Sequence, residues 1–332
     1  MTRFPRSPAR RHLLATMLTA ALAGLPAGAA LAQAGGFPNK PVRIIVNNAP
    51  GGAVDVVARV IGQPLQEALG QPVVVENRGG AGGLLGGEAV AKAPADGYTL
   101  LCTAGSMVVI SPHLQRNLPF DPEKLVPVAA AGRATLFLLT QPDVPARNVD
   151  ELVKHMKANP GRLSFGSAGN GSSLHIAGEM FKSQTGTFAV HVPYRGASPA
   201  IQDLLAKNLD FVFDSGTGLE QVRAGKLRLL AVANKTRSSM FPDTPTMEQA
   251  GIKGFDAGST YGFLAPAGTP PEVVARLNTE INKILTQKSV RDRLMGIGAE
   301  PTPMSPADFR AVLADDSRRF GAIIRERRIS IE

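Results

Sequence analysis

Tryptophan is absent from this chain of 332 residues, and cysteine occurs once, at Cys102. A lone cysteine excludes a disulfide framework, and its position within the apolar run YTLLCTAG predicts a buried free thiol. Beyond the first 34 residues, no segment approaches the roughly 18 consecutive apolar residues that a membrane-spanning helix needs. We therefore expect the mature chain to be soluble and free of disulfides.

Clustered basic residues are also scarce. Four of the basic residues behind the formal net charge of +9 are arginines within the first 34 residues, which leaves +5 for the rest of the chain. Only the run RERR, at residues 325–328, comes close to the basic and aromatic clusters of nucleic-acid-binding proteins. A solvated helix explains that run better, so we expect no nucleic-acid partner.

Residues 1–34 have the three parts of a secretory signal peptide. A basic start with four arginines precedes an apolar run over residues 13–26, and small residues up to Ala34 offer a cleavage site. The adjacent Arg10 and Arg11 also suit a twin-arginine signal, so both export routes stay open. We predict that this segment is removed and that the mature protein lies in the periplasm.

Short β-branched runs alternate with helix-period runs along the rest of the chain. Strand and helix periods that take turns predict parallel sheets with helices on both faces, an α/β fold. A mature chain of about 300 residues favours two domains over one. Because no low-complexity linker is present, we expect the chain to cross between domains on strands. Residues 35–138 and 261–332 should then form one domain and residues 139–260 the other.

Four loops between predicted strands and helices are rich in glycine or hydroxyl residues. They are NNAPGGAVD (47–55), TAGSMV (103–108), GSAGNGSS (166–173) and VPYRGASP (192–199). In a parallel sheet such loops emerge at the carboxyl ends of the strands, where ligands bind. Backbone N–H groups at the start of a helix favour anions. The four loops therefore predict a negatively charged small molecule as the ligand.

The sequence lacks residues that a phosphate-binding loop or a catalytic site requires. GSAGNGSS has the spacing of a phosphate loop, but Ser172 stands where a lysine must reach the phosphates. No serine lies in the G-x-S-x-G turn of an α/β-hydrolase. His175 and Glu179 make an H-x-x-x-E pair that could bind a metal or orient a base, yet we find no third ligand. We expect no cofactor, no metal and no catalytic residue.

Capture of a carboxylate without chemistry is the interpretation that remains. Ser167, Ser172 and Ser173 offer rotatable hydroxyls, and Gly169 and Gly171 let successive N–H groups converge on one anion. The alternative is that Ser172 or Ser173 only N-caps the following helix. A cap needs one serine whereas this loop supplies three, which favours binding.

Five further candidates each have a structural alternative. Asp55 is placed to reach back to the first N–H groups of a helix, which favours a cap over ligand contact. Arg195 could pair with a carboxylate or lie solvated on the rim. Asp214 could accept from a ligand, although a cap of the loop SGTG is slightly favoured. Asn47 and Asn48 could sort polar from apolar ligands or only form a turn.

Several stretches together resemble the Bug-type substrate-binding proteins of tripartite tricarboxylate transporters. The most specific are FPNKPVRIIVNNAPGGAVDVVAR, GSAGNGSSLHIAGEMF, VPYRGASPAIQDLLA and YGFLAPAGTP, and the likeness runs from Phe37 to about Phe320. The resemblance implies a type II periplasmic binding protein fold, with two α/β lobes closing over a di- or tricarboxylate, an acidic amino acid or an aromatic acid. It also implies delivery to the membrane permease subunits of the transporter. We expect a monomer.

In that family, loops matching residues 47–55 and 167–173 hold the ligand carboxylate. Here Asn47 and Asn48 replace the usual proline and aromatic residue, and Thr260 stands where tryptophan is frequent, which predicts a smaller or more polar ligand. The predicted ligand-binding residues are Asn47, Asn48, Ala49, Gly51, Gly52, Asp55, Ser106, Ser167, Gly169, Asn170, Gly171, Ser172, Ser173, Arg195 and Asp214. Two alternatives stay open, a sensory receptor that presents its ligand to a membrane histidine kinase and an exported enzyme that uses the His175 and Glu179 pair.

Overall fold

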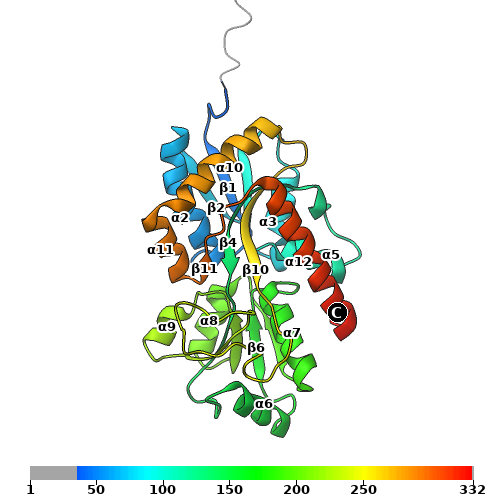
Figure 1. The fold of residues 1–332 in the computed structure, drawn as a ribbon. Helices are drawn as coiled ribbons and strands as arrows, with labels where there is room; N and C mark the ends of the chain where they lie inside the picture. The colour runs from blue at the N-terminus through cyan, green and yellow to red at the C-terminus, as the bar shows by residue number, and fades with distance from the viewer. Residues whose placement is uncertain (1–35, 331–332) are drawn as a thin grey trace, which may run out of the picture. The chain divides into compact units, whose positions relative to one another are not determined.

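The computed structural model describes residues 36–330 (Figure 1), so the predicted signal peptide lies outside the described residues. Of the described residues, 36–39 belong to a separate unit, and residues 40–330 belong to one compact unit. That unit contains two β-sheets with helices packed against each of them. Within the described residues, no helix is both long enough and apolar enough to cross a lipid bilayer.

The first sheet has six strands in the order β11-β4-β10-β3-β1-β2. Its strands are β1 (Val42–Val46), β2 (Val73–Asn77), β3 (Thr99–Thr103), β4 (Val126–Ala134), β10 (Ser259–Ala265) and β11 (Ala299–Glu300). β1 pairs in parallel with β2 and β3, whereas β10 is antiparallel to both β3 and β4. The sheet is therefore mixed.

The second sheet has five strands in the order β7-β6-β8-β5-β9. Its strands are β5 (Phe137–Thr140), β6 (Ser164–Ser167), β7 (Val190–Pro193), β8 (Phe211–Asp214) and β9 (Arg228–Val232). β6 is parallel to β7 and β8, and β5 is antiparallel to β8 and β9.

The expectation of purely parallel sheets is wrong at the strands that lead from one sheet to the other. β4 leads directly into β5, and the segment after β9 leads back into β10. A strand whose chain arrives from the other sheet enters at the end of the sheet that faces that other sheet. A strand that follows a helix of its own sheet enters at the opposite end. The two kinds of strand therefore run antiparallel to each other. The proposed domain limits, near residues 138 and 260, remain a prediction.

Helices cover both faces of the first sheet. The helices and 3-10 turns that accompany this sheet are α2 (Ala53–Leu69), η2 (Ala81–Gly83), α3 (Leu84–Ala91), α4 (Ser106–Val109), α5 (Ser111–Leu114), η3 (Pro122–Lys124), α10 (Pro271–Thr286), α11 (Lys288–Gly296) and α12 (Pro306–Arg327). α2, α10 and α11 pack together on one face, and α12 packs with α4 on the other. α2 buries Val57, Ile61 and Leu65 completely, as expected from their spacing on one helical face.

The helices of the second sheet are α6 (Val149–Ala158), α7 (Ser173–Thr185), α8 (Ala197–Leu205) and α9 (Leu219–Arg223). α7 packs closely on the sheet at Gly178, where a Cβ atom would lie 2.1 Å from Cε2 of Phe165. Phe165 in turn stacks on Phe211, with ring centroids 5.6 Å apart. This close contact holds α7 against the sheet.

Asn234, in the segment from β9 to β10, forms hydrogen bonds to the connection between β4 and β5. Its side-chain amide donates to the Ala134 carbonyl at 3.0 Å and accepts from the Leu136 N–H at 2.9 Å. The returning segment passes so close that a Cβ atom on Gly258 would lie 2.4 Å from Asn234 Nδ2. Both connections are therefore held in one place, directly beside the cavity described next.

Candidate functional site

Three helices from the two sheets begin at one cavity. α2 follows β1 of the first sheet, and α7 and α8 follow β6 and β7 of the second. Residues of their first turns line the cavity: Ala53 and Val54 of α2, Ser173 and Leu174 of α7, and Ala197 of α8. The first N–H groups of a helix lack an intrahelical acceptor and lie at the positive end of the helix dipole. The cavity is therefore suited to an anion.

The cavity lining contains no charged side chain, so its positive potential comes from the N-termini of the helices. The lining residues are Asn48, Gly52, Ala53, Val54, Ala104, Ser106, Ala134, Leu136, Ala168, Ser172, Ser173, Leu174, Ala197, Ser215, Ser259 and Tyr261. The cavity has a volume of about 30 Å³, room for about one or two water molecules. A carboxylate of several heavy atoms needs more space, so the loops from the two sheets must separate to admit it.

In the loop after β1, Asn48 and Gly52 line the cavity. The side chain of Asn47 instead makes its hydrogen bonds within the protein. Asn47 is 2% exposed, and its amide donates to Thr103 Oγ1 at 3.0 Å and to the Gly83 carbonyl at 3.4 Å. Ala49 and Gly51 also lie outside the lining. This loop is held in shape by its own side chains.

Asp55 anchors the same loop from within α2. Its carboxylate accepts from the Gly51 N–H at 2.9 Å, from Arg59 Nε at 3.0 Å and from Asn77 Nδ2 at 2.9 Å. Burial favours the neutral acid, but these hydrogen bonds more than offset it and hold the pKa of Asp55 below its usual range. Asp55 does not line the cavity, and its contacts are those of a loop anchor.

In the loop before α7, Ser172 and Ser173 line the cavity. Ser172 is the N-cap of α7, because its hydroxyl accepts from the His175 N–H at 3.2 Å. Ser173 is 6% exposed, and within the described residues its hydroxyl makes no hydrogen bond. The two serines therefore differ in role: Ser172 caps the helix, and Ser173 keeps a free hydroxyl at the cavity.

The other predicted residues of that loop shape it from outside the lining. Ser167 Oγ accepts from the Gly169 N–H at 3.1 Å and lies 2.6 Å from His191 Nε2. Gly169 and Gly171 have φ values of +117° and +75°, which favour glycine. Asn170 is exposed. The loop turns sharply here, and the turn directs Ser172 and Ser173 at the cavity.

The three remaining predicted residues lie in three different environments. Ser106 is 8% exposed and lines the cavity from the start of α4. Arg195 is exposed, lies outside the lining, and makes no ion pair with another described residue. Asp214 is fully buried, and its Oδ2 accepts from the N–H groups of Gly216 and Gly218 at 2.9 Å each. Burial raises the pKa of Asp214 to about 6.

Sequence reasoning missed the floor of the cavity, which the connecting strands build. Ala134 and Leu136 come from the β4 to β5 connection, and Ser259 and Tyr261 come from β10. The Tyr261 hydroxyl donates to the carbonyl of Ser215, which also lines the cavity, at 3.2 Å. Ser259 and Tyr261 are two residues apart and so share one face of the strand. That alternation, at an expected crossing, was the signal available in the sequence.

The His175 and Glu179 pair lies within the packing of α7. The His175 ring stacks on His191 with centroids 4.0 Å apart, and its Nδ1 accepts from the Gly171 N–H at 3.2 Å. Glu179 Oε1 lies 3.7 Å from His175 Nε2 and 2.7 Å from Lys182 Nζ. Among residues 36–330, no cluster of three or more potential metal ligands occurs. The pair has the contacts of a structural element.

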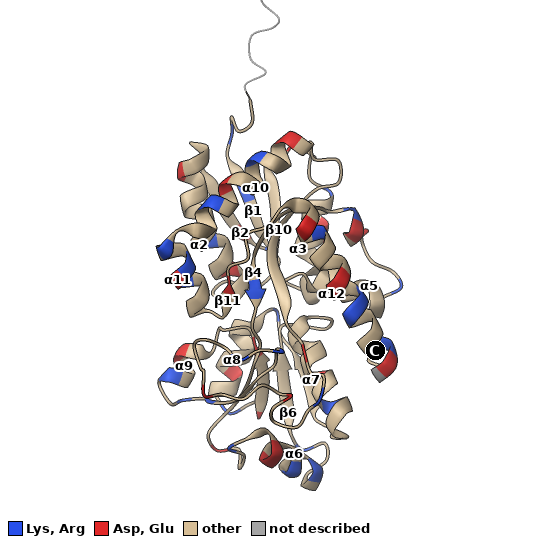
Figure 2. Ribbon diagram, viewed as in Figure 1, with Lys and Arg blue, Asp and Glu red and all other residues tan. Residues whose placement is uncertain are grey.

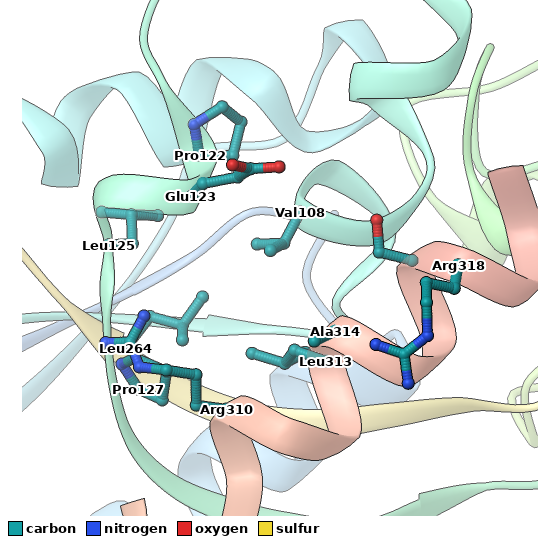
Figure 3. Close-up of a pocket in the computed structure, with 11 residues that line it drawn as sticks. Val108, Pro122, Glu123, Leu125, Pro127, Leu264, Arg310, Leu313, Ala314 and Arg318 are labelled. Atoms are coloured by element: carbon teal, nitrogen blue, oxygen red, sulfur yellow. The ribbon is translucent and has the colours of Figure 1, made fainter. Parts of the chain in front are cut away.

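A larger pocket, of about 380 Å³, lies on the surface between η3 and α12. Figure 3 shows Glu123 above this pocket and Arg310 and Arg318 on α12 below it, around apolar walls that include Leu125 and Leu313. Charged residues of both signs are common on the outer helices, including α11 and α12 (Figure 2). Because this pocket offers exposed side chains of both signs and is lined by no residue from the starts of α2, α7 and α8, we place the anion site in the smaller cavity.

The chain is similar to known proteins over most of its length. Residues 57–329 match the model of a family described as tripartite tricarboxylate transporter family receptor. Protein BugT of Bordetella pertussis is 38% identical over 301 residues, which are 90% of this chain and 92% of BugT. An R. palustris protein solved with adipate has a TM-score of 0.86 and 31% identity, over 89% of this chain and 99% of its own. MatC from Rhodopseudomonas palustris, solved with bound malate, has a TM-score of 0.82 and 31% identity, over 87% of this chain and 100% of the MatC chain.

Proposed function

The chain belongs to the tripartite tricarboxylate transporter receptor family, and from this premise we propose that it captures a small carboxylate in the periplasm for delivery to membrane permease subunits. Membership confirms the resemblance to Bug-type proteins and the α/β periplasmic binding protein fold expected from the sequence. Uptake is favoured over sensing because the family is one of transporter receptors. Export by residues 1–34 and a monomeric state remain predictions.

One observation carries the proposal: the N-termini of α2, α7 and α8 meet at a cavity that has no charged side chain in its lining. Hydrogen bonds to a charged group contribute about 1.5 to 3 kcal/mol each, and micromolar affinity needs about −8 kcal/mol. Three or four N–H and hydroxyl donors from the two sheets are therefore sufficient. No arginine is required to hold the anion.

The lining favours a short aliphatic acid over a flat aromatic one. Its only ring belongs to Tyr261, which is completely buried and whose hydroxyl is already bonded to Ser215. The remaining apolar lining comes from small or aliphatic side chains such as Ala134 and Leu136. The acids in the two solved relatives, adipate and malate, support the same class.

We propose that binding occurs without catalysis. His175, which could have served as a base, is 2% exposed, bonded to the Gly171 N–H and absent from the cavity lining. If the protein hydrolysed, oxidised or decarboxylated a bound acid, incubation would yield a product of different mass. We expect mass spectrometry to recover the acid unchanged.

Native mass spectrometry of freshly purified protein, followed by thermal-shift titration with succinate, malate, adipate, benzoate and inorganic phosphate, tests the function. We expect a co-purified aliphatic acid and stabilisation by one or more of the aliphatic dicarboxylates. Stabilisation by benzoate alone would overturn the ligand class. If none of these anions stabilised the protein and nothing co-purified, the proposal of a carboxylate receptor would be wrong.

A further inference from the structure

Ser259 has a hydroxyl that is both buried and unsatisfied. It is 1% exposed, and no described residue accepts from it or donates to it. It lies at the start of β10 and lines the cavity. A buried hydroxyl without a hydrogen bond costs about 1 to 3 kcal/mol, so one kept at a ligand cavity indicates a partner that arrives with the ligand.

Two arginines form hydrogen bonds to the residues on either side of Ser259. Arg319 Nη2 donates to the Gly258 carbonyl at 2.7 Å, and its Nη1 donates to the Asp256 carbonyl at 2.6 Å. Arg133 Nη2 donates to the same Gly258 carbonyl at 3.3 Å, and its Nη1 lies 3.3 Å from Thr260 Oγ1. Residues on both sides of Ser259 are thus fixed by charged donors.

Asp316 holds the two arginines together. Its carboxylate, 3% exposed, accepts from Arg133 Nη1 at 3.1 Å and from Arg319 Nη2 at 2.8 Å. A buried ion network of this kind gains little net stability, because the desolvation of its charges offsets their attraction. Its geometric effect is specific, since it joins α12 and β4 to the strand that presents Ser259. Precise placement of that strand accounts for the network better than stability does.

The surroundings of Ser259 define what it would recognise. The helix N-termini offer donors for a carboxylate, while the floor contributes Ala134 and Leu136, which cannot hydrogen-bond through their side chains. A ligand held by its carboxylate at the helices therefore lays its carbon chain along the floor. Ser259 can then bond a hydroxyl, or another polar substituent, on that chain.

We propose that Ser259 is a specificity-determining contact for a polar substituent on the bound acid, and that Arg133 and Arg319 are positioning residues for it. This inference rests on the proposed function and deepens it, because it names the subclass of carboxylate. The receptor prefers substituted aliphatic acids over their unsubstituted counterparts of equal length.

Calorimetric titration of the full mature protein with malate and succinate tests the inference, since these acids differ by one hydroxyl. Ser259→Ala should weaken malate binding about two- to tenfold, the range expected for a neutral hydrogen bond, and leave succinate binding within about twofold. Ser111→Ala is the matched control, because Ser111 is also 1% exposed and unpaired within the described residues but lies outside the lining. It should change neither affinity.

The positioning role is tested by the ratio of the two affinities. Arg319→Gln and the more conservative Arg319→Lys should lower the preference for malate, whereas Arg318→Gln should leave it unchanged, since Arg318 is exposed and bonded to Asp315. A folded Arg319 variant with the original ratio would contradict the positioning role. An equal effect of Ser259→Ala on both acids would overturn the specificity role. If the unaltered protein bound malate no more tightly than succinate, or bound only other acids, this inference would be wrong while the proposed function still held. If it bound none of the acids tested, the proposed function itself would fail.

Discussion

The backbone of Gly82 lies directly against the carbonyl of Asn170. A Cβ atom built on Gly82 would be 2.2 Å from that oxygen. Gly82 belongs to η2 beside the first sheet, and Asn170 belongs to the loop between β6 and α7 of the second. Glycine at residue 82 therefore lets η2 approach closely the loop whose Ser172 and Ser173 line the cavity.

Gly82→Ala should impair this approach and weaken ligand binding. Overpacking of this kind costs about 1 to 3 kcal/mol, or roughly a five- to 150-fold loss of affinity if it falls on the bound state alone. Gly254→Ala is a matched control, because Gly254 has φ +67° against +65° for Gly82 and no atom within 4 Å of its built Cβ. Calorimetric titration should show a loss for the first variant only. Equal affinities would show that the loops do not need to meet.

Ser172→Ala and Ser173→Ala should separate stability from binding. Ser172 caps α7 through the His175 N–H, so its loss should lower the free energy of unfolding by about 1 kcal/mol. Ser173 caps nothing and keeps its hydroxyl at the cavity, so Ser173→Ala should weaken ligand binding while unfolding in urea stays unchanged. Unchanged binding in the Ser173 variant would remove that hydroxyl from the site.

His191 should make the protein less stable in acid. Burial and the neighbouring His175 lower the pKa of His191 to about 3, against about 6.5 for the unfolded chain. Between pH 6.5 and pH 3 the unfolded chain binds a proton that the folded protein excludes, so stability falls as the pH falls through this range. The loss at pH 5 should be about 1 kcal/mol, after allowance for partial exposure.

His191→Gln should remove much of that fall when the free energy of unfolding is measured at pH 7 and pH 5. His155→Gln serves as the control, because His155 is half-buried on α6 and bonded only locally, to Asn159. A fall of the same size in the His191 variant and in the unaltered protein would show that other groups cause it.

Asn234→Ala should destabilise the junction of the two sheets. The change leaves the Ala134 carbonyl and the Leu136 N–H without their partner, at a cost of about 2 to 4 kcal/mol. Asn208→Ala should cost less than about 0.5 kcal/mol, since the Asn208 amide makes a solvent-exposed hydrogen bond to Asp203 at 3.3 Å. Urea unfolding measures both, and equal midpoints would contradict the bridging role of Asn234.

The sequence predicted the local elements well because their signals are local. The β-branched run VRIIV forms β1, and Pro270 and Pro271 lie at the start of α10, where a missing N–H costs nothing. β4 escaped notice because its run VPVAAAGRA is rich in small residues and has little β-branched character. The direction of the antiparallel strands was also not predicted, since it depends on whether the chain reaches a strand from its own sheet or from the other one.

The walls of the site were easier to predict than its floor. Ser172 and Ser173 stood out because three serines and three glycines crowd the start of one helix. Ser259 gave no such signal, since a lone serine in a strand looks the same whether its hydroxyl is satisfied or not. Its unsatisfied hydroxyl and the packing of Arg133, Arg319 and Asp316 around its neighbours become visible only in the structure, because Arg133 is far from the other two in the sequence.

Cys102 gives the protein a practical use. Its thiol is completely buried, its Sγ lies 3.7 Å from the Val54 carbonyl, and burial raises its pKa, so it is chemically inert in the folded protein. A cysteine introduced at the exposed Arg195, two residues before the lining residue Ala197, would be the one reactive thiol on the molecule. Labelled there with an environment-sensitive fluorophore, the protein should report binding of the proposed acid as a change in emission.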